Sequence, residues 1–195
     1  SEFIQKLTHD DYRVRSAAAN RLGTLRDRSV VPGLVAALQD THSFVIEAAA
    51  KALGHIGDSA AIAPLIEMLE TLNHLGRHAA VEALGEWGDS STLPILVAML
   101  GDEDEHVRSR AASVLGKAPF VDRAVRQLLA CLADDAATVR SEVVSALGRV
   151  TSPISLQLLI TALRDADTNT RIAAARALGK RSDADVIDPL LGHFL

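Results

Sequence analysis

Apolar side chains recur along the chain at a spacing that favours amphipathic helices. Ile62, Leu65, Ile66 and Leu69 stand at i, i+3, i+4 and i+7, so they share one face of a helix. We name elements of this kind A helices. The same spacing recurs in four further stretches: Val31, Leu34, Val35, Leu38; Leu93, Leu96, Val97, Leu100; Val125, Leu128, Leu129, Leu132; and Leu156, Leu159, Ile160, Leu163.

A second helical pattern follows each A helix, and we name these elements B helices. In residues 107–116 it reads Val-Arg-x-x-Ala-Ala-x-x-Leu-Gly, and its small residues allow neighbouring backbones to approach closely. A fixed period of this length predicts stacked helix pairs, an all-α right-handed α-solenoid. The closing pair returns every 31 residues, once after 32, at Leu22-Gly23, Leu53-Gly54, Leu84-Gly85, Leu115-Gly116, Leu147-Gly148 and Leu178-Gly179.

The repeats predict one solenoid domain over residues 1–195, with six B helices and an incomplete repeat at each end. The final A helix has an apolar face formed by Ile187, Leu190, Leu191 and Phe194. Solenoids need polar caps at their ends. We therefore expect this terminal helix to pack on a further repeat or on a second chain.

Recurrent polar residues mark the turns. Asp40, Asp102, Asp134 and Asp165 each lie two residues after the last leucine of an A helix, where a carboxylate is expected to cap the coming B helix. The glycine of each Leu-Gly pair is expected at a helix C-cap. An arginine follows six residues after the aspartate, as Arg108 follows Asp102. We interpret these pairs as a structural ladder between repeats, because catalysis needs one constellation and not several copies.

Four features together resemble the HEAT-repeat superfamily, most closely its phycobilisome-lyase HEAT-like type. They are the turn aspartate, the Val-Arg of the B helix, the Leu-Gly after it, and an early proline in A helices (Pro32, Pro64, Pro94 and Pro189). The resemblance covers almost the whole chain. It implies a protein-binding scaffold first. Relatives that handle bilin chromophores, and a group that binds di-iron and hydroxylates a modified lysine, imply two alternatives.

Composition narrows the classes of partner. The formal net charge is −5, opposite to the basic excess of a general nucleic-acid binder, so nucleic acid is disfavoured as a partner. A single cysteine, Cys131, excludes an intrachain disulfide and fits a reducing compartment. No apolar run reaches the length of a membrane span. We expect a cytoplasmic protein with no membrane partner.

The outward positions of the B helices vary between repeats while the core positions stay constant. The family resemblance implies that these helices line the concave surface. Such variation is typical of a specific binding face, and equally of an unconstrained solvated surface. We predict that the concave face binds a protein of unknown identity through Phe44, Lys51, His55, Leu75, His78, Glu82, Glu86, His106, Arg110, Lys117, Arg149 and Arg176.

The second and third repeats depart from the pattern. Ile46 replaces the arginine, Phe44 precedes it, and Leu75 stands in the next repeat, while the turn at 71–73 lacks its aspartate. One interpretation is an apolar docking ridge around Phe44 and Leu75, because a large exposed aromatic anchors an interface well. The other, which we favour, is local repacking: Ile46 and Leu75 fill the space left by the absent ladder.

Histidines raise the question of a metal site. His74, His78 and Glu82 follow one another at i, i+4 and i+8 with His55 on the neighbouring helix, and two histidines one turn apart can chelate a transition metal. The di-iron relatives use adjacent His-Glu pairs, whereas no histidine of this chain precedes a glutamate. We therefore interpret these as surface histidines and predict no catalytic residue, no cofactor and no metal.

Basic side chains gather toward the C-terminal part of the concave face, at Lys117, Arg149, Arg176, Lys180 and Arg181. They suit an acidic partner, and the scarcity of aromatics for base stacking favours a protein over a nucleic acid. The sequence thus predicts a non-catalytic protein-binding scaffold. The alternatives are an accessory subunit of a bilin lyase or other chromophore-handling system, and a metal-dependent enzyme of the HEAT-like hydroxylase type.

Overall fold

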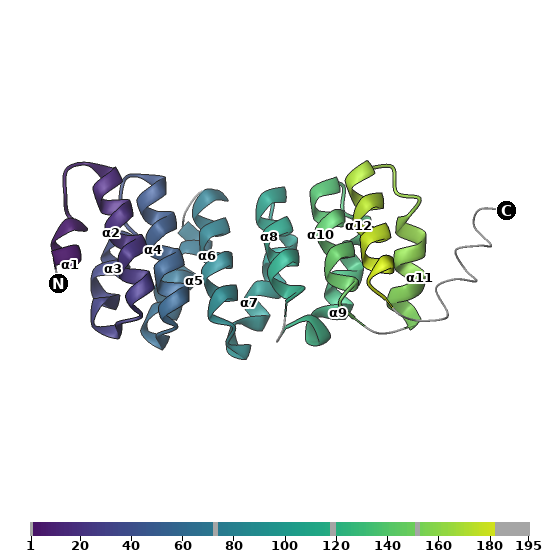
Figure 1. Ribbon diagram of the computed structural model, residues 1–195, viewed down its shortest axis with the longest axis horizontal. Coiled ribbons are helices and arrows are strands. Elements are labelled where there is room, and N and C mark those ends of the chain that lie inside the picture. Colours follow the sequence, from purple (N-terminus) through teal and green to yellow (C-terminus); the bar gives the residue numbers. More distant parts are fainter. Residues whose placement is uncertain (1, 72–73, 118–119, 151–152, 182–195) are drawn as a thin grey trace. The chain divides into compact units, whose positions relative to one another are not determined.

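The computed structural model describes residues 2–71, 74–117, 120–150 and 153–181. These residues form twelve α-helices and five short 3-10 helices, with no β-strand among them (Figure 1). The predicted all-α repeat architecture is therefore confirmed. The chain divides into two compact units, Ser1–Leu96 and Val97–Leu195, which we call unit 1 and unit 2.

In unit 1 the B helices stack in chain order, because α4 contacts both α2 and α6 (Figure 1). Each A helix contacts the B helix that follows it. The A helices are α1 (Glu2–Lys6), α3 (Val31–Ala37) and α5 (Ile62–Thr71), and the B helices are α2 (Tyr12–Leu25), α4 (Ser43–Ile56) and α6 (His74–Trp87).

Unit 2 repeats this arrangement, with α10 in contact with both α8 and α12. Its B helices are α8 (Glu105–Leu115), α10 (Ala137–Leu147) and α12 (Thr168–Gly179). Its A elements are the 3-10 turn Met99–Gly101, α9 (Val121–Ala130) with the 3-10 turn Cys131–Ala133, and α11 (Pro153–Ala162), while α7 (Leu93–Ala98) contains the division between the two units.

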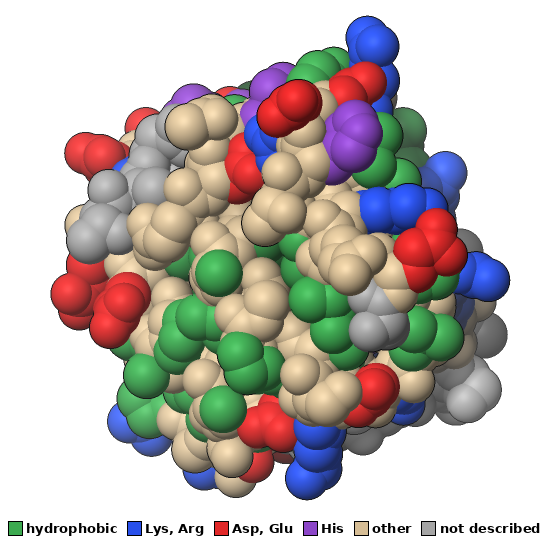
Figure 2. Space-filling model, turned by 90° about the vertical axis from the view of Figure 1, so that its left-hand side faces the viewer, with side chains coloured by type: hydrophobic (Ala, Val, Ile, Leu, Met, Phe, Trp, Pro, Cys, Tyr) green, Lys and Arg blue, Asp and Glu red, His purple; other side chains and the backbone are tan. Residues whose placement is uncertain are grey.

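The N-terminal end of unit 1 carries accessible apolar side chains. Helix α1 contains no buried residue, and Ile4 is 37% exposed. Figure 2 looks onto this end and shows hydrophobic side chains gathered over the lower centre of the face, with acidic and basic groups at its margin. Apolar side chains are therefore accessible on this face of the described residues.

Aspartates begin many helices, but they are not the ones predicted. The side chains of Asp11, Asp104 and Asp167 cap α2, α8 and α12, and those of Asp27 and Asp58 cap the 3-10 turns before α3 and α5. The prediction that the four turn aspartates cap the B helices is wrong. Each accepts instead from the backbone N–H two residues later, inside its own turn: His42 to Asp40, Asp104 to Asp102, Ala136 to Asp134 and Asp167 to Asp165.

A ladder of arginines and aspartates is present and connects successive repeats, but the predicted pairing is wrong, because each arginine forms its ion pair with the aspartate of the next repeat and not with the aspartate six residues before it. In one rung, Arg108 donates from Nε and Nη2 to both carboxylate oxygens of Asp134, at 2.8 and 2.9 Å. Its Nη1 donates to the carbonyls of Asp102 and Glu103 in the turn before its own helix. Each arginine thus binds two turns at once. Three such rungs are Arg15–Asp40, Arg108–Asp134 and Arg140–Asp165.

The ladder carboxylates stay ionised to unusually low pH. Hydrogen bonding to the arginine lowers the pKa of Asp40, Asp134 and Asp165 below the ordinary value of an aspartate, against the opposing effect of their burial. The ladder is interrupted at α4, where half-buried Ile46 occupies the arginine position. These ion pairs therefore have a structural role, because each of them joins two neighbouring repeats.

The Leu-Gly glycines allow neighbouring B helices to touch. A Cβ atom placed on Gly54 would lie 2.7 Å from the Ala83 carbonyl oxygen, closer than such atoms approach. The C-cap prediction is wrong at this position, because α4 continues to Ile56 and Gly57 caps it with a φ of 65°. It is right at Gly116 and Gly148, which are the C-caps of α8 and α10, but wrong at Gly179, because the C-cap of α12 is Lys180.

Candidate functional site

All twelve side chains predicted to contact a partner are at least partly accessible, and none is buried. Ten lie on the solvent-facing side of the B helices, and Lys117 and Arg149 lie just after the ends of α8 and α10; we call this set the B-helix face. The structure divides them between the two units. Unit 1 holds Phe44, Lys51, His55, Leu75, His78, Glu82 and Glu86, and unit 2 holds His106, Arg110, Lys117, Arg149 and Arg176.

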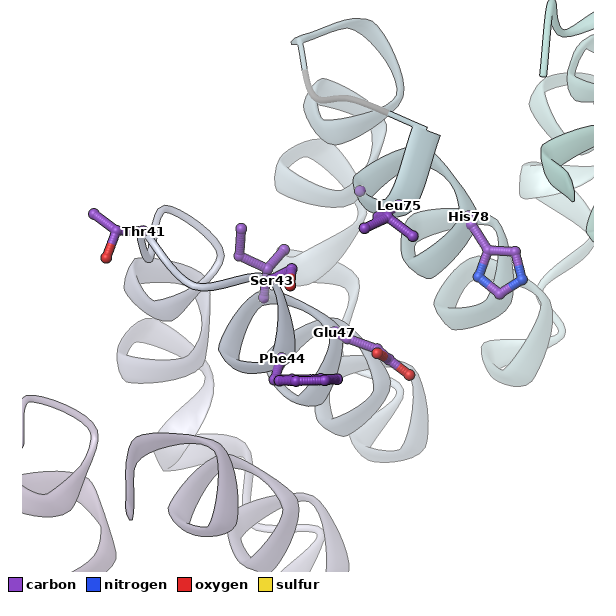
Figure 3. Close-up of a pocket in the computed structure, with 8 residues that line it drawn as sticks. Thr41, Ser43, Phe44, Glu47, Leu75 and His78 are labelled. Carbon is purple, nitrogen blue, oxygen red and sulfur yellow. The ribbon is translucent and has the colours of Figure 1, made fainter. Parts of the chain in front are cut away.

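A groove of about 390 Å³ lies between α4 and α6 in unit 1, and we call it the α4–α6 groove. Figure 3 shows Phe44 and Glu47 extending from α4, with Leu75 and His78 on α6. Three of its lining residues were singled out from the sequence as binding candidates. The lining consists of Thr41, Ser43, Phe44, Ile46, Glu47, Leu75, Gly76 and His78.

Two large apolar side chains stand open to solvent on this groove. Phe44 is 58% exposed and Leu75 is 53% exposed, and each precedes the glycine of its Leu-Gly pair by ten residues. They therefore occupy the same position in successive repeats. The interpretation that Leu75 fills an interior space is wrong, because it remains exposed. Only Ile46, which is half-buried, fits the repacking that we favoured from the sequence.

A stack of aromatic rings supports Phe44 on its N-terminal side. The Tyr12 and His42 rings lie nearly parallel, with centroids 3.5 Å apart, and the His42 and Phe44 rings follow at 5.5 Å. The guanidinium of Arg13 lies 5.5 Å from the Tyr12 ring. Sequence reasoning missed this stack, because Tyr12 and His42 belong to different repeats. The ring of Phe44 is thus held in place although its face is open.

Polar groups accompany the apolar walls. The groove lining includes one carboxylate, Glu47, and one imidazole, His78. Farther along the same two helices, the Nε2 of His55 lies 3.9 Å from the Glu86 carboxylate. An apolar floor with a few polar groups is the usual composition of a recognition site.

A second groove of about 370 Å³ lies between α10 and α12 in unit 2, and we call it the α10–α12 groove. Its lining includes two arginines and a lysine predicted to form the basic end of the binding face, together with Glu142 and Ile172. The Arg149 Nη1 donates to the Gly116 carbonyl at 3.0 Å. The residues that line it are Ser141, Glu142, Ser145, Gly148, Arg149, Asn169, Ile172, Ala173, Arg176, Ala177 and Lys180.

The structure gives little support for a metal site at the histidines or for a reactive thiol at Cys131. Within the residues that the structure describes, no group of three or more His, Cys, Asp or Glu is placed to hold a metal ion, and this includes His74, His78 and Glu82. Cys131 is half-buried, its Sγ lies 3.4 Å from the Gln127 carbonyl, and burial raises its thiol pKa. A raised pKa disfavours the thiolate, which is the nucleophilic form.

Comparison with known proteins agrees with the repeat architecture. A sequence model of HEAT repeats matches residues 1–75, 73–147 and 125–195, which together span the chain. The chain belongs to the HEAT-repeat family. No curated protein sequence matches this HEAT-repeat protein. No helix in its described part is long and apolar enough to cross a membrane.

Solved structures with a similar fold come from several sources. YibA of Escherichia coli has a TM-score of 0.70 at 19% identity, covering 98% of this HEAT-repeat protein and 74% of YibA. A chain from the CpcE–CpcF complex of phycocyanin lyase from Nostoc sp. PCC7120 has a TM-score of 0.65 at 24% identity, covering 99% and 87%. Human deoxyhypusine hydroxylase has a TM-score of 0.51 at 24% identity, covering 91% and 82%. These likenesses establish the fold.

Proposed function

We propose that this HEAT-repeat protein is a non-catalytic scaffold that binds a protein partner through its B-helix face. In unit 1 an apolar side chain of the partner would sit in the α4–α6 groove. The observation that carries the proposal is the exposure of Phe44 and Leu75 at the same position of two successive repeats, on one groove. A single exposed apolar residue needs no explanation, whereas apolar side chains that share a concave site are typical of a binding surface.

Rigid support makes such a surface effective. The Tyr12–His42–Phe44 stack holds the aromatic wall. The close contact at Gly54 fixes α4 against α6, so little conformational entropy is lost when a partner binds. Aromatic anchors that become buried when the partner binds dominate the energy of many protein interfaces. The groove therefore combines an anchor with a preorganised frame.

Two further points support a scaffold. The ion pairs of the ladder connect successive repeats, which leaves the B-helix face to vary. In addition, a similar fold occurs in a protein solved as the complex of CpcE and CpcF, where it assembles with a protein partner.

The test uses the intact chain and a library of random peptides displayed on phage. Peptides selected on the wild-type protein are measured by anisotropy against Phe44→Ala with Leu75→Ala. The matched control is Leu25→Ala with Ile154→Ala, whose side chains are 52% and 64% exposed outside the groove. We expect the groove variant to lose about tenfold or more in affinity and the control less than about twofold. Equal losses in both variants, or no selected peptide, would contradict the proposal.

An accessory subunit of a bilin lyase is the second candidate. The likeness to a chain of the phycocyanin lyase complex, which covers 99% of this protein, favours it over other specialised roles. Titration of the purified protein with a bilin tests it directly. A saturable shift of the bilin absorbance, retained in the Phe44→Ala variant, would support this candidate as a function separate from the α4–α6 groove.

A further inference from the structure

The α10–α12 groove carries a local excess of positive charge in an acidic protein. Arg149, Arg176 and Lys180 line it with a single carboxylate, Glu142, while the whole chain has a formal net charge of −5. Neither Arg176 nor Lys180 has a carboxylate oxygen within 4.0 Å among the described residues. Arg149 donates to a backbone carbonyl, which leaves its charge uncompensated. Uncompensated cations gathered in one groove attract an anionic ligand.

The groove also has a partly apolar floor. Ile172 is 42% exposed and lies among the small side chains of Ala173 and Ala177. Hydroxyl and amide donors from Ser141, Ser145 and Asn169 complete the lining. This composition suits a ligand that carries both carboxylates and an apolar side chain. An acidic segment of a protein has that chemistry.

The repeat spacing indicates the conformation of such a segment. Arg149 and Lys180 each follow the glycine of a Leu-Gly pair, so they occupy the same position in adjacent repeats. Packed helices lie about 8–10 Å apart, and a chain in the extended polyproline II conformation advances about 3.1 Å per residue and returns to the same side every three residues. Carboxylates three residues apart therefore match the distance between the two cations.

We propose that the α10–α12 groove binds an extended acidic segment of a protein partner, with carboxylates three residues apart on Arg149 and Lys180. The proposal rests on the proposed scaffold function only in sharing the B-helix face, since the groove lies in unit 2 and the Phe44 site in unit 1. A nucleic acid fits the groove less well. Its lining includes no aromatic ring for base stacking, and Glu142 and the net negative charge both repel phosphates.

The experiment measures fluorescence anisotropy of labelled peptides with the full chain at low salt. The probe is Glu-Leu-Gly-Glu-Leu-Gly-Glu, and its isomer Gly-Leu-Glu-Glu-Glu-Leu-Gly has the same composition but contiguous carboxylates. We expect the spaced peptide to bind about fivefold or more tightly than the isomer, because only its carboxylates match the repeat spacing. Raising the ionic strength should weaken binding, since these ion pairs are accessible to solvent.

Three variants locate the binding. Arg176→Ala with Lys180→Ala should reduce the affinity for the spaced peptide about tenfold. The control, Arg123→Ala with Arg126→Ala, removes the same charge from exposed positions on α9 and should change the affinity less than about twofold. Glu142→Gln removes a repulsive charge and should tighten binding about twofold. A gain of this kind cannot result from damage to the fold.

The outcomes separate the two grooves. The proposal is overturned if the spaced peptide shows no saturable binding, if the α9 control loses as much as the groove variant, or if the isomer binds equally well. Tighter binding of a DNA duplex, lost in the Arg176 and Lys180 variant, would assign the groove to nucleic acid instead. Loss of peptide binding in the Phe44→Ala variant would also count against it, because that site lies in unit 1.

Discussion

A methyl group added at Gly54 tests whether the close contact between α4 and α6 holds unit 1 together. Gly54 lies in the last turn of α4, where alanine is the better helix former by about 1 kcal/mol. Helix propensity alone therefore predicts that Gly54→Ala stabilises the protein. The new Cβ, however, would lie 2.7 Å from the Ala83 carbonyl oxygen and 2.9 Å from its Cα. Both atoms belong to the backbone of α6, so no side-chain rotation can relieve the overlap.

Relief requires α4 and α6 to move apart along a contact that excludes water. Such overpacking costs about 1–3 kcal/mol, and the propensity gain offsets at most about 1 kcal/mol of it. We therefore expect Gly54→Ala to lower the free energy of unfolding by about 1–2 kcal/mol. Gly179→Ala provides the control, because it alters the same repeat position at the end of α12, where nothing described lies within 4 Å of the added atom.

Urea unfolding followed by circular dichroism measures both variants at one temperature. The control should be neutral or slightly stabilised, and Gly54→Ala should unfold at a lower urea concentration. If Gly54→Ala proves as stable as the control, the two helices are not held at the contact distance seen here. The explanation of the Leu-Gly motif as a device for helix contact would then fail.

Three further predictions concern the core, the ladder and the thiol. Leu115→Ala, at a fully buried position, should cost about 2–5 kcal/mol in urea unfolding, and a loss no larger than that of half-exposed Ser113→Ala would contradict the core assignment. Asp134→Asn should cost about 1–3 kcal/mol at pH 7. Because the pKa of Asp134 is lowered in the folded state, its contribution is complete above the unfolded value of about 3.9 and disappears as the pH falls through the folded value, so the difference from wild type should vanish in strong acid. Cys131 should react with iodoacetamide more slowly than a free thiol at pH 8, since burial raises its pKa, and an equal rate would contradict its burial.

Most of the fold could be predicted from the repeat period. Six recurrences of Leu-Gly and the i, i+3, i+4, i+7 spacing located the B helices and most of the A helices, because burial on one helix face is a periodic requirement. The same signal identified the core, since Leu22, Leu53, Leu84 and Leu115 are all buried. Periodicity records which side of each helix is buried, and that is sufficient to predict stacked pairs.

The roles of individual turn residues were harder to predict. Asp102 and Asp104 are both short acidic residues before α8, and propensity does not tell which one caps the helix. A distant residue decides which aspartate caps the helix. The first aspartate of such a turn binds the arginine of the preceding repeat, as Asp134 binds Arg108, and so does not cap the helix. Likewise, the contact at Gly54 depends on Ala83, one repeat away. Interactions between repeats leave only a weak trace in local sequence.

The candidate site was predictable in part. The variable positions of the B helices all proved accessible, and Phe44 and Leu75 were recognised as irregular. The sequence could not show whether their side chains are exposed, since an apolar residue that replaces a member of an ion pair can be either buried or exposed. The stacking of Tyr12 on His42 had no periodic signal, because it joins one side chain of a helix to one of the next turn.

The irregular repeat links the ladder to the groove. A rung needs an arginine on one B helix and an aspartate in the next turn, as in Arg108 and Asp134. At α4 both partners are absent from the sequence, with Ile46 at the arginine position and Thr71 at the aspartate position. Removing one partner alone would leave a charge without its counterion, which is costly, whereas removing both is tolerated. The paired change replaces a rung with an apolar wall, since Ile46 lines the groove beside Phe44. An apolar groove at a departure from a repeated rule supports the proposed binding role, because proteins depart from local consistency mainly at functional sites.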